Sequence, residues 1–540
     1  MTTPIPLNQF IMKTHYIKPL VMALSLAFAV PAHAGSERQD LETLRATTLA
    51  LVDALVKKGV LSAEAAQDLV RQAEKKGQEA AEASAKAETA PGVVRVPYIP
   101  EVVKREISEQ IRQEVVAQAK TEQWGDVNAV PEWVGRLKWE GDFRLRYQDD
   151  LFASGNAPGG DFTLPPYGLG MSNPVDPFNP INTETDRQRL RVRARLGLTA
   201  KITDYVSTGF RLSTGNTTEP YSTNQTLGND FNKYTLVLDR AYAKVQPWDW
   251  LSVSGGRIPN PFFSTDLVWS DNLNFDGLAA TFTPWARSDR SGKPFFTLGA
   301  FPLQEVETST VNLARDKWLL AAQAGLDWKM DGDTRWRFGL AYYDYRNIAA
   351  VYDPLAVGSQ YNYAGSVLTA RQKGNTRFLV APYSSDYPNL YGLAADYSLV
   401  NLTATLDLAH FDPIHVILDG DVVKNVGYDK ARVDSLLGTP QADRTLGWQT
   451  KVTVGWPAMH NRGDWQAFLG YRHLERDAVL DAFADSDFRL GGTNSKGFFI
   501  GGSYGMDRNT WLTARWLSAD AIDGLPFAVD VLQVDFNAKF

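Results

Sequence analysis

The sequence predicts an all-β transmembrane barrel, antiparallel and up-and-down, with about 16 strands and an N-terminal helical region before it. Three observations favour this fold. The chain ends in an alternating strand with a C-terminal aromatic residue, about a dozen similar segments precede that strand, and a secretion signal occupies the N-terminus. Bacterial outer-membrane barrels combine all three features.

The C-terminal strand is two-sided. Side chains of a strand point alternately to opposite faces, so a period of two gives one apolar and one polar face. The apolar residues are Leu532, Val534, Phe536, Ala538 and Phe540, and the polar ones are Gln533, Asp535, Asn537 and Lys539. We expect the apolar face to contact outer-membrane lipid, and the barrel-assembly machinery to recognise this strand through Phe540.

Residues 1–34 are typical of a signal peptide. Lys13 and Lys18 precede a short apolar run, and Ala32 and Ala34 form an A-x-A cleavage site. The run is too short to span a hydrocarbon core of about 30 Å. The sequence therefore predicts cleavage after Ala34 and export past the inner membrane. Together with the barrel pattern, this predicts the outer membrane of a Gram-negative bacterium.

Composition excludes several classes of protein. The 540 residues include no cysteine, so lipoprotein, disulfide and thiolate chemistry are excluded. A net charge of -7 gives no sign of nucleic-acid binding. The mean hydropathy is -0.27, yet the chain has 15 Trp, 21 Tyr and 26 Phe, which suits aromatic belts at two membrane interfaces. A large soluble β-protein would share much of this composition.

Residues 35–130 are predicted to form a periplasmic helical region. Apolar residues recur every three or four positions from Leu41 to Leu55, as in a short coiled coil, and every four positions from Val103 to Val115. Such stripes pack against another copy or against the barrel, and a tether or a contact with the cell wall is the alternative. A homotrimer is expected by analogy with barrels of this size.

Residues 131–540 are predicted to form the barrel. Long and short connections alternate along this region, which requires an even number of strands and places the long loops at one end. A soluble β-sandwich has no reason to sort its loops in this way, and a barrel of this size encloses water. The candidate strands lie near 134–148, 187–201, 204–214, 234–246, 249–258, 274–284, 293–303, 317–329, 334–345, 394–410, 414–426, 446–457, 464–475, 495–506, 509–518 and 529–540.

Arginines alternate with apolar residues in the second strand. If the apolar residues between Leu190 and Leu198 face lipid, these arginines face the lumen, because each charge on the lipid side would cost about 2–4 kcal/mol. Arg144 and Arg146 on the first strand are expected to join them. The predicted pore-lining set is Arg144, Arg146, Arg187, Arg189, Arg191, Arg193 and Arg195. Such a row favours anions, unless loop carboxylates neutralise it and leave only a transverse field.

The third long loop, residues 257–275, is the candidate for an inward fold that narrows the channel. It contains Asp266 and Asp271, which are expected to lie opposite the arginines and form a constriction with a strong local field.

No catalytic or metal motif is found. The mature chain has four histidines, His410, His415, His460 and His473, without a nucleophile motif, metal-ligand spacing or phosphate loop. The sequence therefore predicts neither an enzyme nor a cofactor.

Several segments resemble the bacterial putative-porin family: LVKKGVLSAEAAQDLV (55–70), VRVPYIPEVVKREISEQI (94–111), PEWVGRLKWEGDFRLRY (131–147), RLRVRARLGL (189–198) and GRIPNPF (256–262). The resemblance implies an outer-membrane barrel for passive transport and supplies no catalytic residues. The function expected is a porin for small hydrophilic solutes or ions, favouring anions through the arginines. The alternative is an anchor or adhesin with a plugged barrel, whose helices bind the cell wall.

Overall fold

The computed structural model describes residues 132–163, 166, 181–288, 290–310, 313–330, 333–353, 373–380 and 391–540. The predicted signal peptide and helical region lie outside the described residues and stay predictions. Contacts divide the chain into residues 1–99 and residues 100–540, and everything described belongs to the second unit.

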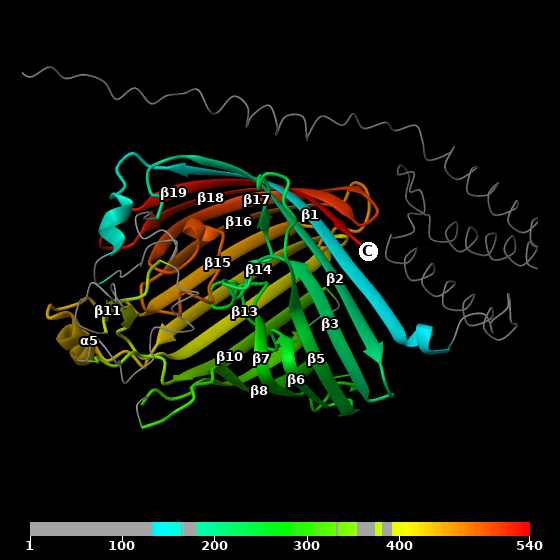
Figure 1. The fold of residues 1–540 in the computed structure, drawn as a ribbon. Helices are drawn as coiled ribbons and strands as arrows, with labels where there is room; N and C mark the ends of the chain where they lie inside the picture. Colours follow the sequence, from blue (N-terminus) through cyan, green and yellow to red (C-terminus); the bar gives the residue numbers. More distant parts are fainter. Residues whose placement is uncertain are drawn as a thin grey trace, which may run out of the picture. The chain divides into compact units, whose positions relative to one another are not determined.

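Sixteen long strands form a closed antiparallel barrel in the described part of the chain (Figure 1). Each pairs with the next long strand along the sequence, and the last pairs with the first. The strands are β1 (Leu137–Phe152), β2 (Arg187–Lys201), β3 (Val206–Thr214), β5 (Leu236–Trp248), β6 (Leu251–Pro259), β7 (Asn274–Phe282), β8 (Gly292–Gln304), β9 (Lys317–Lys329), β10 (Thr334–Arg346), β13 (Ser398–Phe411), β14 (Ile414–Asn425), β15 (Leu446–Gly455), β16 (Trp465–Leu474), β17 (Ser495–Asp507), β18 (Thr510–Ala521) and β19 (Ala528–Lys539).

The remaining elements are short and lie in or beside the loops. Strand β4 (Gln225–Thr226) pairs with β2, and β11 (Arg377–Leu379) pairs with β12 (Tyr391–Leu393). Helix α5 (Lys430–Leu437) begins after Asp429, whose carboxylate accepts from Arg432 N at 3.1 Å, and ends at Gly438. Short 3-10 helices span Glu132–Arg136, Gly159–Thr163 and Phe488–Leu490. Among the described residues, no helix is long and apolar enough to cross a membrane.

The predicted strands are confirmed, with ends that differ by a few residues. The strand expected from residue 394 begins at Ser398, because the backbone of Ala394 donates instead to Thr376 O at 2.9 Å in a neighbouring loop segment. The alternation of long loops and short turns is also present, except that the last loop, 522–527, is shorter than the turns 283–291 and 456–464 at the other end. Three of the long loops contact the inner wall of the barrel, and they are L2 (215–235), L3 (260–273) and L7 (475–494).

The wall is apolar outside and polar inside. In β19, the side chains of Val534 and Phe536 are 39% and 36% exposed, whereas Gln533 and Asp535 are 0% and 4% exposed. Leu190 of β2 is likewise exposed, on the face opposite the arginines. This is the reverse of a soluble protein and is the arrangement that lipid around the barrel requires.

Exposed aromatic residues cluster toward both ends of the outer surface. Strand β9 carries Trp318 near its long-loop end and Trp328 near its short-turn end, with Leu320 and Leu326 between them. Ten residues of strand rise by roughly 33 Å, which is about 25 Å along the axis of a barrel tilted by about 40°. The distance between the two tryptophans therefore matches the apolar band of an outer-membrane barrel.

The first and last strands close the barrel at Gly141 and Phe540. Their backbones exchange two hydrogen bonds of 3.0 Å, and the Phe540 ring lies over Gly141 on the outer face. A Cβ atom at position 141 would lie 2.2 Å from Phe540 Cζ. Because glycine has no Cβ atom, it leaves the space that the Phe540 ring occupies where β1 pairs with β19.

We expect Gly141→Val to weaken the closure. The added side chain collides with the Phe540 ring, and overpacking of this kind lowers the free energy of unfolding by about 1–3 kcal/mol. Urea unfolding in detergent, followed by heat-modifiable mobility on gels, measures the change. Gly420→Val is the matched control, because a Cβ atom at position 420 meets nothing within 4 Å. Equal stability of the two variants would contradict this role of Gly141.

Candidate constriction site

The structure brings the predicted arginines of the first two strands together on the inner wall. Cross-strand register places Arg144 opposite Arg193, and Arg146 opposite Arg191. Arg187 lies near the long-loop end of β2, is exposed, and forms no ion pair with any described residue. We call the other six arginines the arginine wall: Arg144, Arg146, Arg189, Arg191, Arg193 and Arg195.

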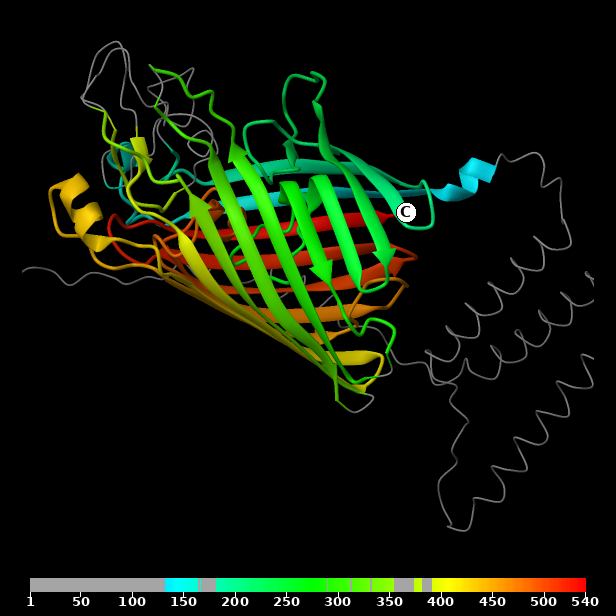
Figure 2. The same ribbon diagram turned by 90° about the horizontal axis from the view of Figure 1, so that it is seen from below.

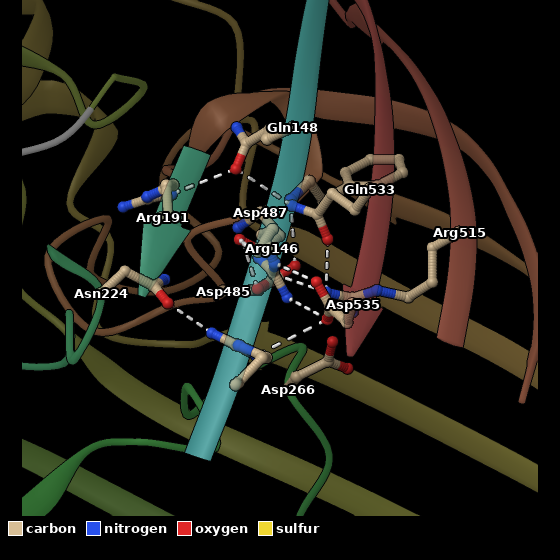
Figure 3. A network of polar contacts seen from close by, with 12 residues as sticks. Arg146, Gln148, Arg191, Asn224, Asp266, Asp485, Asp487, Arg515, Gln533 and Asp535 are labelled. Carbon is tan, nitrogen blue, oxygen red and sulfur yellow. Dashed lines mark hydrogen bonds and ion pairs between the residues drawn. The ribbon is translucent and has the colours of Figure 1, made fainter. Parts of the chain in front are cut away.

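Arg146 is the most deeply buried member of the arginine wall. Its side chain is 1% exposed and forms two hydrogen bonds with Asp535 of β19, of 2.7 and 2.9 Å. The same guanidinium group contacts Asp487 of L7 at 3.1 Å (Figure 3). Arg146 therefore connects the first strand, the last strand and a loop.

Carboxylates on the barrel wall pair with three further arginines. Arg193 and Arg195 share Asp142, at 2.9 and 2.7 Å, and Arg189 pairs with Asp150. These carboxylates lie on the same inner face of β1 as Arg144 and Arg146. Part of the positive charge of these arginines is thus neutralised, as the sequence analysis considered, and the neutralising carboxylates lie on strands as well as on loops.

Arg144 and Arg191 have mainly uncharged partners. Arg144 donates to the side-chain amide oxygen of Asn224 in L2 and lies 3.9 Å from Asp535. Arg191 donates to the Gln148 amide oxygen at 3.1 Å (Figure 3). Because amide oxygens carry only partial charge, both guanidinium groups keep most of their positive charge uncompensated.

L3 contacts widely separated parts of the inner surface. The backbone of Phe263 exchanges hydrogen bonds with the Gln323 side chain of β9, of 2.7 and 2.8 Å. Thr265 donates to Asp421 of β14 at 2.7 Å, and Asn272 accepts from Arg195 of β2 at 3.1 Å. L3 is therefore folded inward, between the arginine wall and the wall formed by β9 and β14.

The two predicted loop carboxylates do not face the arginine wall as pairs. Asp266 binds Arg472 of β16 at 2.8 Å and the Gln449 amide of β15 at 2.9 Å. Asp271 is exposed and forms no ion pair within the described ranges. Asp266 therefore pairs with an arginine of β16 that lies outside the arginine wall, and the proposed opposition of the L3 carboxylates to the arginine wall stays a prediction.

L7 supplies the carboxylates that the sequence reasoning missed. Asp487 binds Arg146 and also Arg515 of β18 at 2.9 Å, and Asp485 binds Arg472 at 3.1 Å. Burial alone would raise the pKa of Asp487, but Arg146 and Arg515 more than offset this and hold the pKa well below its usual range. Asp487 is therefore a fixed negative charge.

A sequence signal for L7 exists in its run of aspartates. Asp477 accepts from Thr376 and Tyr397, and Asp481 binds Arg377, so these two hold L7 to the loop between β10 and β13. Asp485 and Asp487 bind the barrel wall instead. An acidic run within a long loop, opposite inward arginines, could have indicated this inward fold.

The inward loops share an apolar core. Leu267 and Trp269 of L3, Tyr343 of β10 and Leu480 of L7 belong to one buried cluster, each at most 2% exposed. The backbone of Ser270 also donates to Phe483 O at 2.8 Å, which joins L3 to L7. The two loops therefore form one packed unit that meets the arginine wall at Asn272 and at Asp487.

A family model described as "Putative porin" matches residues 45–540. The chain belongs to the putative-porin family. This membership supports an outer-membrane channel and confirms the resemblance found in the sequence. No curated protein matches the chain.

Solved outer-membrane proteins are similar to this chain at low identity. OprB of Pseudomonas putida at high pH is 12% identical, with 77% of this chain and 97% of that chain covered and a TM-score of 0.44. The outer-membrane channel DcaP of Acinetobacter baumannii is 12% identical, with 75% and 97% covered and a TM-score of 0.37. OmpF of Salmonella typhi in complex with daunomycin is 9% identical, with 75% and 97% covered and a TM-score of 0.38.

Family membership and fold favour a channel over an enzyme. The described residues hold no group of three His, Asp or Glu side chains placed to bind a metal. His415 contacts Asp407 at 2.7 Å beside the β13–β14 turn, an arrangement that also suits a structural role.

We expect Asp487→Asn to loosen L7. The substitution removes the negative charge that Arg146 and Arg515 share, and a hydrogen bond to a charged group contributes about 1.5–3 kcal/mol. Hydrogen exchange of backbone amides in residues 475–494 should become about tenfold faster or more. Asp204→Asn is the control, because Asp204 is exposed in a turn. Unchanged exchange in L7 would show that the apolar core alone holds the loop.

Proposed function

We propose that this protein is a diffusion porin for small hydrophilic solutes, and that its arginine wall makes the channel favour anions. One observation carries the proposal: the arginines of β1, β2 and β18 outnumber the carboxylates they bind. Arg144, Arg146, Arg189, Arg193, Arg195 and Arg515 pair with only four carboxylates, those of Asp142, Asp150, Asp487 and Asp535. Arg191 forms no ion pair with any residue in the described part of the chain and donates to the Gln148 amide oxygen.

The excess of positive charge acts where the lumen is narrowed. Sixteen strands enclose more space than wall side chains fill, and the L3–L7 unit occupies part of it. Fixed guanidinium groups between low-dielectric walls raise the local concentration of anions and lower that of cations. The carboxylates on the wall reduce this effect without cancelling it.

The alternative of a plugged anchor or adhesin makes a different prediction for transport. It places the activity in the N-terminal helices, which lie outside the described residues. Liposome swelling separates the two functions, because a diffusion channel admits sugars or amino acids whereas a plugged barrel does not. A homotrimer, with cleavage after Ala34, remains part of the proposal.

We expect Arg191→Ala with Arg193→Ala to reduce the preference for anions. A unit charge about 7 Å from a passing ion contributes roughly 0.6 kcal/mol in water, so anion entry should fall about two- to threefold for each arginine removed. Reversal potentials in planar bilayers under a salt gradient measure the change. Arg287→Ala is the control, since Arg287 is 81% exposed and pairs with Asp249 in a turn. Unchanged selectivity in the double variant would reject a filter at the arginine wall.

A further inference from the structure

We propose that Arg144, Arg191 and Arg193 form a saturable binding site for an oxyanion, namely the carboxylate or phosphate group of a permeating solute. The proposal rests on the proposed function and goes further, because a diffuse positive field attracts any anion, whereas a site recognises a particular chemical group. Three features of the structure support it.

The first feature is the juxtaposition of like charges. Arg144 lies directly opposite Arg193 across the β1–β2 ladder, and the next inward pair is Arg146 opposite Arg191. Like charges directly opposite each other destabilise a strand pair unless an anion lies between or beside them. For Arg146 the structure supplies Asp535 and Asp487. Arg144 and Arg191 have no equivalent carboxylate at hydrogen-bond distance among the described residues.

The second feature is that the nearby carboxylates are already in use. Asp535 receives two hydrogen bonds from Arg146, Asp142 is shared by Arg193 and Arg195, and Asp487 is shared by Arg146 and Arg515. Glu219 of L2 lies near enough to attract Arg191, yet it forms no ion pair with it in the described structure. An added anion would therefore meet guanidinium groups whose charge is not yet balanced.

The third feature is incomplete pairing in side chains that are only partly buried. The Nε atoms of Arg144 and Arg191 have no hydrogen-bond partner, and because they are themselves buried, they add unbalanced charge without being open to a solute. The side chains of Arg144 and Arg193 are 11% and 14% exposed, compared with 1% for Arg146. The Arg146 side chain is thus inaccessible to a solute and has a structural role, whereas Arg144 and Arg193 remain partly accessible.

These features favour an oxyanion over a halide. A planar guanidinium group donates two parallel hydrogen bonds to a carboxylate or phosphate, which chloride cannot accept in the same way. The amide oxygens of Gln148 and Asn224, which now accept from Arg191 and Arg144, hold those side chains in place and are weaker acceptors than an oxyanion (Figure 3). An arriving oxyanion can therefore replace them.

The test is block of chloride current by inorganic phosphate or by succinate in planar bilayers that contain the full-length protein. We expect both probes to reduce the conductance to a plateau, with a half-saturating concentration that Arg144→Gln or Arg191→Gln raises by about tenfold. Arg187→Gln removes the same charge from the same strand, outside the site, and should shift that concentration by less than about twofold. Arg191→Lys keeps the charge without the planar fork and should weaken block while anion selectivity persists.

Each outcome bears on one of the two proposals. Absence of any channel current from correctly folded protein would overturn the proposed function and this site with it. An anion-selective current that falls without saturation would overturn only the site, as would equal shifts for Arg187→Gln and Arg191→Gln. Saturable block by succinate alone, or by phosphate alone, would support the site and identify its chemical class. Heat-modifiable mobility confirms that each variant is folded.

Discussion

Every backbone polar group of this chain that lies in the hydrocarbon core must find its partner within the protein. The pairing of β19 with β1 meets this constraint, because it removes the two strand edges that an open sheet of sixteen would expose. The hydrogen bonds between Gly141 and Phe540, and the ring that covers the glycine, complete the pairing at the short-turn end. Figure 2 shows the closed wall from a second direction.

Closure determines where charge can be placed. Once apolar residues such as Leu190 and Phe536 take the outer face, alternation sends the arginines of β2 and the acidic residues of β1 and β19 inward. Adjacent strands then bring Arg144, Arg146, Arg191 and Arg193 together, although nearly fifty residues separate the two groups in sequence. L3 and L7 add carboxylates and share an apolar core, so the electrostatics of the lumen depend on two loops as well as on the wall.

The strands could be predicted because period-two patterns are local, and the arginine wall because strand parity assigns each residue to a face. Turn spacing also gave the even strand number. The partner of Asp266 could not be predicted in this way, since Arg472 lies about two hundred residues further along and the path of L3 across the lumen is not set by a local pattern. The role of L7 was missed for the same reason: Asp487 binds Arg146 and Arg515, which are distant in sequence and close only in the folded protein. A local pattern shows on which face of a strand a side chain lies, but the ion-pair partner of that side chain depends on contacts between distant parts of the chain.

The contacts of Arg146 have a consequence for the order of folding. Arg146 and Asp535 are 389 positions apart, so their hydrogen bonds can form only after the two ends of the barrel have met. Asp487 then binds Arg146 of β1 and Arg515 of β18, the two strands on either side of β19. The ion pairs of the constriction therefore form late in folding, after β1 has paired with β19. An intermediate in which this pairing is incomplete would have a wider and less selective interior than the folded protein.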